Sequence, residues 1–191
     1  MPRITKPVEE RRQEIIDTAK KLFTENGFDK TQVADISAHM NTAQGLVYHY
    51  FKSKTDILYA VIDELAAEQA ERVNKILADS SGNALEKLTL LFRSRPDYEC
   101  YDKLIPSLKS DKAIIEYCAK KMSVSAKSLL LSLIEQGNAD GSWQCEYPQE
   151  TAVFILSGVT GLMGLFGSPI QEGEVAKAFT NIIFRILGAQ K

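Results

Sequence analysis

Hydrophobic residues recur at helical spacing along almost the whole chain, whereas the alternation typical of β-strands is weak. In residues 8–26 they follow an i, i+3, i+4, i+7 pattern, and the segment ends at Asn26-Gly27, a pair typical of a helix C-terminus. The expected buried face of this helix consists of Ile15, Ile16, Ala19, Leu22 and Phe23. The pattern predicts an all-α fold that begins with a helix over residues 8–26.

Two short helices joined by a tight turn are predicted next. Thr31 is the expected cap of the first, which ends near Met40. Asn41 suits the turn because Asn tolerates a left-handed backbone. The second short helix covers about residues 42–50, with a buried stripe of Leu46, Val47 and Tyr50.

Longer helices are predicted after residue 52. Ser53 and Asp56 form a capping-box pattern that opens a long helix, and the polar stretch 79–83 ends it. The remaining helices are expected over residues 84–92, between Pro96 and Pro106, from residue 110 to Gly137, from Pro148 to about Gly167 and over residues 174–187, with a loop at residues 138–147.

One uncharged window raises the question of a membrane span. Residues 151–171 contain no charged side chain and are long enough to cross a bilayer. The window also holds four glycines and Pro169, and acids flank it rather than Lys or Arg, so neither hydropathy nor positive charge favours insertion. We expect no membrane span.

The composition is that of an ordinary globular protein. Of 191 residues, 45% are hydrophobic and 25% are charged, which excludes the disordered, collagen-like and disulfide-scaffold classes. Cys100, Cys118 and Cys145 cannot all pair, and the N-terminus lacks a signal-peptide pattern, so we expect a cytoplasmic protein. His39 and His49 have no cysteine near them, so no metal site is expected. We expect no cofactor.

Two short helices joined by a tight turn and supported by a preceding helix form the helix-turn-helix arrangement, whose second helix enters the DNA major groove. Here that second helix begins with the small or polar residues Thr42, Ala43, Gln44 and Gly45, which allow close approach to base edges. The Gln44 amide suits adenine, and a Thr42 or Ala43 methyl group suits a thymine methyl. The surrounding candidate donors to phosphate oxygens are Thr31, Tyr48, His49, Lys52 and Lys54.

Several fixed spacings in residues 11–60 carry a family resemblance. The run Thr31-Gln-Val-Ala-Asp-Ile36, then Gly45-Leu-Val-Tyr48-His-Tyr50-Phe51, then Lys54 and Leu58, resembles the signature of the TetR family of bacterial transcriptional regulators. Departures fall at Ser37, where the family commonly has Ala, and at residues 41–43, where Gly-Val-Ser is usual. They bear on base preference rather than on the fold.

The resemblance implies a homodimeric repressor, less often an activator, that binds a palindromic double-stranded operator and is released by a small-molecule effector. It implies a three-helix DNA-binding domain at residues 1–52 and a larger helical domain at residues 53–191 that binds the effector and dimerises through its last two helices. By motif position, the expected phosphate contacts are Thr31, Tyr48 and Lys54, and the residues expected to face the groove are Thr42, Ala43, Gln44 and His49.

Charge is biased toward the expected DNA-binding domain. The whole chain has a net charge of −2, yet residues 1–55 carry nine basic and seven acidic side chains. This asymmetry is modest, because strong nucleic-acid footprints show larger basic clusters. It agrees with DNA binding by this part of the chain and does not identify it alone.

Glycines recur at every third residue near the end of the helix that starts at Pro148. A glycine inside a helix costs about 0.5–1 kcal/mol relative to Ala, so close approach of another helix is the expected compensation. In a dimer built from the last two helices, the expected contact residues are Gly158, Gly161, Leu162, Phe166, Ile183 and Ile186. The alternative is a partly broken helix packed within its own subunit.

Aromatic residues of the larger domain are candidates for the effector pocket, since such pockets are mostly apolar with a few polar groups. They are Phe92, Tyr98, Tyr101, Tyr117, Trp143 and Phe154, and they predict an apolar or aromatic effector. The alternative for each of them is an ordinary core position.

Two other functional classes fit the sequence less well. An enzyme is disfavoured because the chain has no Gly-rich phosphate loop, no G-x-S-x-G motif and no His with a partnered nucleophile. A redox sensor stays open as an alternative signal, in which Cys100, Cys118 or Cys145 sets the DNA affinity. Cys145, beside Trp143, is its strongest candidate, and the helical period places Cys118 in the core.

Overall fold

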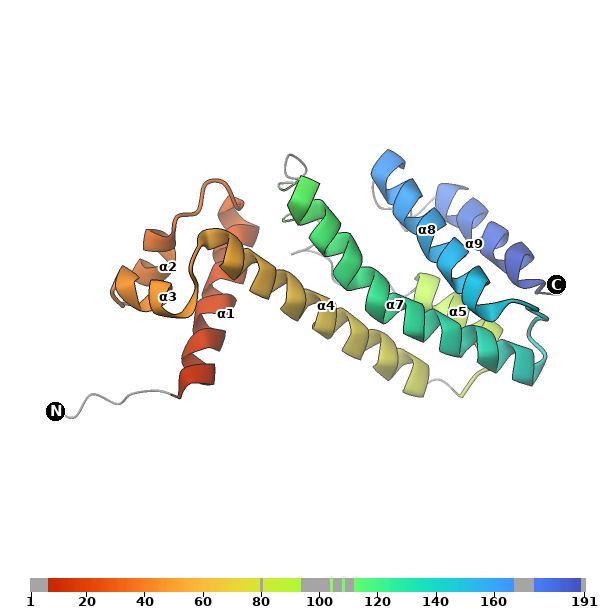
Figure 1. Cartoon of the computed structure of the whole chain (residues 1–191). Coiled ribbons are helices and arrows are strands. Elements are labelled where there is room, and N and C mark those ends of the chain that lie inside the picture. The colour runs from red at the N-terminus through yellow and green to blue at the C-terminus, as the bar shows by residue number, and fades with distance from the viewer. Residues whose placement is uncertain are drawn as a thin grey trace. The chain divides into compact units, whose positions relative to one another are not determined.

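The computed structural model describes residues 7–79, 81–93, 104, 108, 112–166 and 174–189, and every regular element in these ranges is helical (Figure 1). The elements are α1 (Val8–Asn26), α2 (Val33–His39), α3 (Gln44–Tyr50), α4 (Lys54–Asp79), α5 (Ala84–Arg93), α7 (Lys112–Asp140), α8 (Pro148–Phe166) and α9 (Glu174–Leu187). The all-α prediction is confirmed. The helix expected between Pro96 and Pro106 lies outside the described residues apart from Leu104.

The chain packs as two compact units. The N-terminal unit comprises residues 1–65 and 97–118, and the C-terminal unit comprises residues 66–96 and 119–191. The N-terminal unit therefore holds all of residues 1–52, the expected DNA-binding domain, together with the first part of α4 and the start of α7. The boundary at residue 52 stays a prediction.

The core of the N-terminal unit is built from the apolar faces of α1, α2, α3 and the first turns of α4. The predicted stripe of α1 is buried as expected, and Phe23 meets Phe28 edge to face with ring centroids 5.2 Å apart. Full burial of each of these side chains contributes about 1.5–3 kcal/mol. The largest fully buried side chains from α2 and α4 are Ile36, Ile57, Leu58 and Ile62, and α3 contributes the buried Val47.

The helix boundaries in this unit follow local polar signals, with one revision. α2 is capped by Gln32, whose backbone N–H donates to Asp35 Oδ2 at 2.7 Å, rather than by Thr31. Asn41 has φ +50°, so the predicted left-handed turn after α2 is confirmed. Ser53 caps α4 as predicted, because its hydroxyl accepts the backbone N–H of Asp56 at 3.0 Å.

The C-terminal unit has a core centred on Trp143, which is 1% exposed. Its indole N–H donates to the Ile134 carbonyl at 2.9 Å, and a Cβ atom added to Gly137 would overlap the indole ring. Gly137 is therefore a packing position inside α7 and not the helix end that the sequence indicated. The helix continues to Asp140 and ends at Gly141, whose φ is +79°, so the loop covers only residues 141–147.

Asp140 ties the end of α7 to the start of α5. Its carboxylate accepts the backbone N–H of Ala84 at 2.7 Å and the hydroxyl of Ser142 at 2.5 Å. The Ser142 hydroxyl, and then the backbone N–H groups, lower the pKa of this carboxyl group. The carboxylate thus satisfies a backbone donor that the first turn of a helix leaves without an intrahelical partner.

None of the helices in the described part of the chain is long and apolar enough to span a membrane. The uncharged window noted above runs through α8 and ends in residues 167–171, which lie outside the described residues.

Candidate nucleic-acid interface

The turn between α2 and α3 holds the two helices in a fixed relation. Asn41 N–H donates to the Ala38 carbonyl at 3.1 Å, and Thr42 N–H donates to the Ser37 carbonyl at 2.9 Å. Behind the turn, Ile36 of α2 and Val47 of α3 are fully buried in the core of the N-terminal unit. The back of α3 is thereby anchored, and its opposite side is left to solvent.

The solvent side of α3 carries most of the predicted DNA contacts. Ala43, Gln44 and His49 are exposed, Tyr48 is 49% exposed, and Thr42 is half-buried. Gln44 and Tyr48 are four residues apart and so lie one above the other on the same helix face. Gly45 is also exposed, with no atom apart from its own helix backbone and chain neighbours within 4 Å of where its Cβ would lie. The predicted contact residues on this side, together with the exposed Lys52, form what we call the α3 face: Thr42, Ala43, Gln44, Tyr48, His49 and Lys52.

Thr31 does not belong to the α3 face. Its side chain is buried, and its hydroxyl donates to the carbonyls of Gly27 at 2.9 Å and Leu22 at 3.3 Å. The hydroxyl therefore closes the turn after α1 instead of pointing to a phosphate. Because of this internal bonding we revise the expected phosphate contact at Thr31.

Lys54 has an internal position as well. Its ammonium group donates to the carbonyls of Phe28 at 2.9 Å and Thr31 at 3.0 Å, and it lies 4.3 Å from the centroid of the Phe28 ring. A cation in the first turn of a helix is unfavourable for the helix dipole, and these carbonyls offset that cost. The ammonium group thus has partners within the protein, so the expected phosphate contact at Lys54 is revised.

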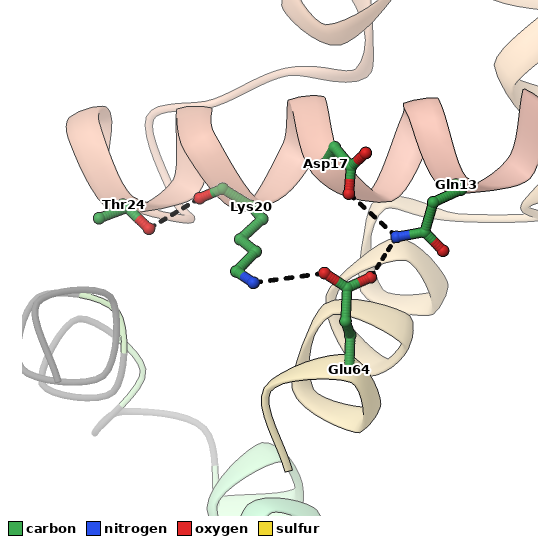
Figure 2. A network of polar contacts seen from close by, with 5 residues as sticks. All are labelled: Gln13, Asp17, Lys20, Thr24 and Glu64. Carbon is green, nitrogen blue, oxygen red and sulfur yellow. Dashed lines mark hydrogen bonds and ion pairs between the residues drawn. The ribbon is translucent and has the colours of Figure 1, made fainter. Parts of the chain in front are cut away.

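A polar contact that sequence analysis did not predict joins α1 to α4. Glu64 of α4 accepts a hydrogen bond from Gln13 Nε2 and lies 3.3 Å from Lys20 Nζ (Figure 2). These partners are 51 and 44 residues away in the sequence, so no local pattern could have pointed to them. The contact joins the helix that supports α2 and α3 to α4.

The aromatic candidates for an effector pocket occupy different kinds of position. In the N-terminal unit, Tyr117 donates its hydroxyl to Asp63 Oδ1 at 2.9 Å, and its ring lies 4.3 Å from that of Tyr59. In the C-terminal unit, Trp143 fills the core while Phe154 is 66% exposed on α8. The side chain of Phe92 and all of Tyr98 and Tyr101 lie outside the described residues. For Trp143 the structure agrees with the alternative of a core position.

Among their described residues, α8 and α9 each expose apolar side chains or glycines. Gly158 and Gly161 are exposed, and within the described residues neither has an atom, apart from its own helix backbone and chain neighbours, within 4 Å of where its Cβ would lie. The exposed large apolar side chains are Val153 and Phe154 on α8 and Ile182 and Ile186 on α9, and we call these four residues and the two glycines the α8–α9 face. Ile183 is 1% exposed and packs in the core of its own subunit, so the expected contact at this position is revised. The side chains of Leu162 and Phe166 lie outside the described residues.

Both described cysteines are buried. Cys145 contacts the Thr151 hydroxyl with an S–O distance of 3.2 Å, and Cys118 belongs to the core of the N-terminal unit. Burial raises the pKa of the Cys118 thiol to about 11, which leaves very little reactive thiolate. Cys100 lies outside the described residues.

Comparison with known proteins places the α3 face in a recognised domain. Residues 15–61 match the model of the family described as bacterial regulatory proteins, tetR family. This segment of the chain is therefore of the TetR-family type. The matched segment runs from α1 into α4 and includes every residue of the α3 face.

Relatives within and beyond this segment are regulators. The chain is 36% identical over 78 residues to the fatty acid metabolism regulator protein of Bacillus subtilis, a match that covers 41% of this chain and 40% of that protein. It is 24% identical over 188 residues to the HTH-type transcriptional repressor KstR2 of Mycolicibacterium smegmatis, covering 91% and 88% of the two chains. These TetR-family matches support a DNA-binding regulator of transcription.

A solved structure supports the same fold over the whole chain. The crystal structure of a transcriptional regulator from Saccharomonospora viridis in complex with choline superposes with a TM-score of 0.65 at 16% identity. The match covers 96% of this chain and 100% of that one.

Proposed function

We propose that this protein is a homodimeric transcriptional repressor of the TetR family that binds palindromic operator DNA through its α3 face. The observation that carries the proposal is the exposure of Ala43, Gln44, Tyr48 and His49 on a helix whose back, at Val47, is anchored in the core. A recognition helix needs this arrangement, because its outer side chains must reach base edges while the protein holds its inner side.

The side chains of the α3 face divide by chemistry into two groups. Gln44 can form paired hydrogen bonds with adenine N6 and N7, and the methyl groups of Thr42 and Ala43 suit a thymine methyl. Tyr48, His49 and Lys52 donate to phosphate oxygens, which position the helix without reading sequence. Loss of Gln44 therefore alters base preference, whereas loss of Lys52 weakens binding to all sequences.

The α8–α9 face supports a homodimer. Its glycines have open space in front of them, so a second helix can approach closely, and its apolar side chains would then leave water. A two-fold axis through this face makes it self-complementary, as most homodimer interfaces are. Each protomer then presents one DNA-binding head, by which we mean α1, α2 and α3. Two heads related by that axis bind two half-sites about one helical turn of DNA apart, or a multiple of it.

We infer that a small molecule with apolar or aromatic character controls the dimer. The fold neighbour from Saccharomonospora viridis is in complex with choline, which supports a small-molecule site in this fold class. The effector acts by population shift, because it binds better to a form in which the heads do not fit the operator. Redox control is not favoured, since the two described thiols are buried and the pKa of Cys118 is raised.

Selection from random duplex DNA tests the proposal. The purified protein is expected to enrich a palindrome with half-sites about one turn apart. Tyr48→Ala and Gln44→Ala variants, checked for unchanged helix content, are expected to lose the palindrome or to change its sequence. Lys112→Met is the control, because Lys112 is exposed at the start of α7 and outside the α3 face. Enrichment of the same sequence by all four proteins would contradict the proposal.

A further inference from the structure

Glu64 lies at the centre of a polar network that joins two helices of the N-terminal unit. Its carboxylate binds Gln13 and Lys20, both on α1, while Glu64 itself belongs to α4. Figure 2 shows the Glu64 side chain reaching from α4 to these two partners. The Gln13 amide also donates to Asp17 Oδ1 at 2.9 Å, so its nitrogen is bound both by Asp17 of α1 and by Glu64 of α4.

The spacing of the two partners gives the network its mechanical effect. Gln13 and Lys20 are seven residues apart, which places them two turns apart on one side of α1. One carboxylate bound at both points resists sliding of α4 along α1 and also resists its rotation. A single contact would leave one of these movements free.

Apolar packing between α1 and α4, which share the hydrophobic core through residues such as Ala19 and Leu58, already restricts their crossing angle. The polar network adds a second restraint of a different kind. Charged hydrogen bonds are directional. The side chains of Lys20 and Glu64 are only 24% and 20% exposed, so solvent and salt screen their attraction less than that of surface pairs.

We propose that Glu64 is a positioning residue for DNA binding. It fixes the angle between α4 and α1, to which α2 and α3 are attached, and thereby selects the spacing of operator half-sites. This inference rests on the proposed function, because it concerns two heads bound to one duplex. Adding one base pair between half-sites moves the second site by about 3.4 Å and rotates it by about 35°. A head held rigidly on α4 cannot follow that shift, whereas a loosened head can.

The test compares affinity for the selected palindrome with affinity for the same palindrome lengthened by one base pair. Glu64→Gln keeps the size of the side chain and a hydrogen bond to Gln13 but loses the charge attraction to Lys20. The affinity for the selected palindrome divided by the affinity for the lengthened one is expected to fall about two- to fivefold. This size matches the strength of a partly exposed ion pair. Lys20→Met removes the same contact from the α1 side and is expected to have the same effect.

A matched control lies on the same helix. Glu71→Gln makes the same chemical change to an exposed pair, Glu71 with Lys75 at 2.9 Å, and is expected to leave the ratio unchanged. The exchanged pair Lys20→Glu with Glu64→Lys is expected to restore most of the wild-type ratio, which a merely structural defect would not allow.

The possible failures are distinguishable. A wild-type protein that binds no palindrome contradicts the proposed function. A wild type that discriminates between the two spacings, together with Glu64→Gln and Lys20→Met variants that discriminate as sharply, overturns the role of Glu64 alone.

Discussion

Replacing Gly137 with Ala tests how the C-terminal unit is packed. In a solvent-exposed helix this change stabilises by about 0.5–1 kcal/mol. At Gly137 the new Cβ overlaps the ring of Trp143, which is a rigid and buried group. Overpacking costs about 1–3 kcal/mol, and displacement of the indole adds about 0.5–1.5 kcal/mol for its bond to the Ile134 carbonyl. We expect a net loss of about 1–3 kcal/mol.

Trp143 also reports on the change, because it is the only tryptophan in the chain. We expect the melting temperature of Gly137→Ala to fall by about 3–10 °C, and the tryptophan emission to shift to longer wavelength before unfolding. Gly45→Ala is the matched control, because Gly45 lies in α3 with no atom near its added Cβ, and it is expected to be neutral or stabilising. A Gly137→Ala protein as stable as the wild type, with an unchanged emission spectrum, would refute the packing argument.

Three further predictions address the head, the acid dependence and the dimer. Lys54→Met is expected to destabilise the protein by about 1–3 kcal/mol through lost carbonyl contacts while leaving the salt dependence of DNA binding unchanged. Lys52→Met is expected to leave stability nearly unchanged and to reduce the slope of log affinity against log salt by about 1 per head; the opposite pattern would restore Lys54 as a phosphate contact. Hydrogen bonds, of which that from Ser142 has the largest effect, lower the pKa of Asp140 in the folded state. The stabilisation by Asp140 is therefore fully present above the unfolded pKa of about 4 and is lost as the pH falls through the folded pKa. Urea titrations should therefore show that the stability difference between wild type and Asp140→Asn shrinks on acidification from pH 6 to below about 4, and a constant difference would exclude this role. Gly161→Leu is expected to give monomers of normal helix content in sedimentation at nanomolar concentration, and persistent dimers would count against the α8–α9 face.

Much of the N-terminal unit could be predicted because its signals are local. The apolar stripe of α1, the left-handed Asn41 and the Ser53 cap each depend on residues within one or two turns of each other. The exposure of Gln44 and Tyr48 follows from the same periodicity, once Val47 is placed inward. The candidate interface was therefore accessible from sequence in outline.

The remaining features depend on contacts between distant segments. Gly137 has the sequence pattern of a helix end, but the indole of Trp143 occupies the space beside it and α7 continues. Lys54 and Thr31 have donor groups that suit phosphate, yet they donate to backbone carbonyls of the turn after α1. Residue type alone does not show whether a donor binds an acceptor within the protein or one on DNA.

In the proposed complex the side chain at position 44 faces the bases of bound DNA. A photo-crosslinking amino acid placed at Gln44 reports this position, with the same group at the exposed Lys112 as the control. On the selected duplex, we expect crosslinks from position 44 to bases within each half-site and none from position 112. A protein that binds the duplex fully and crosslinks from position 112 but not from position 44 would contradict the proposed complex.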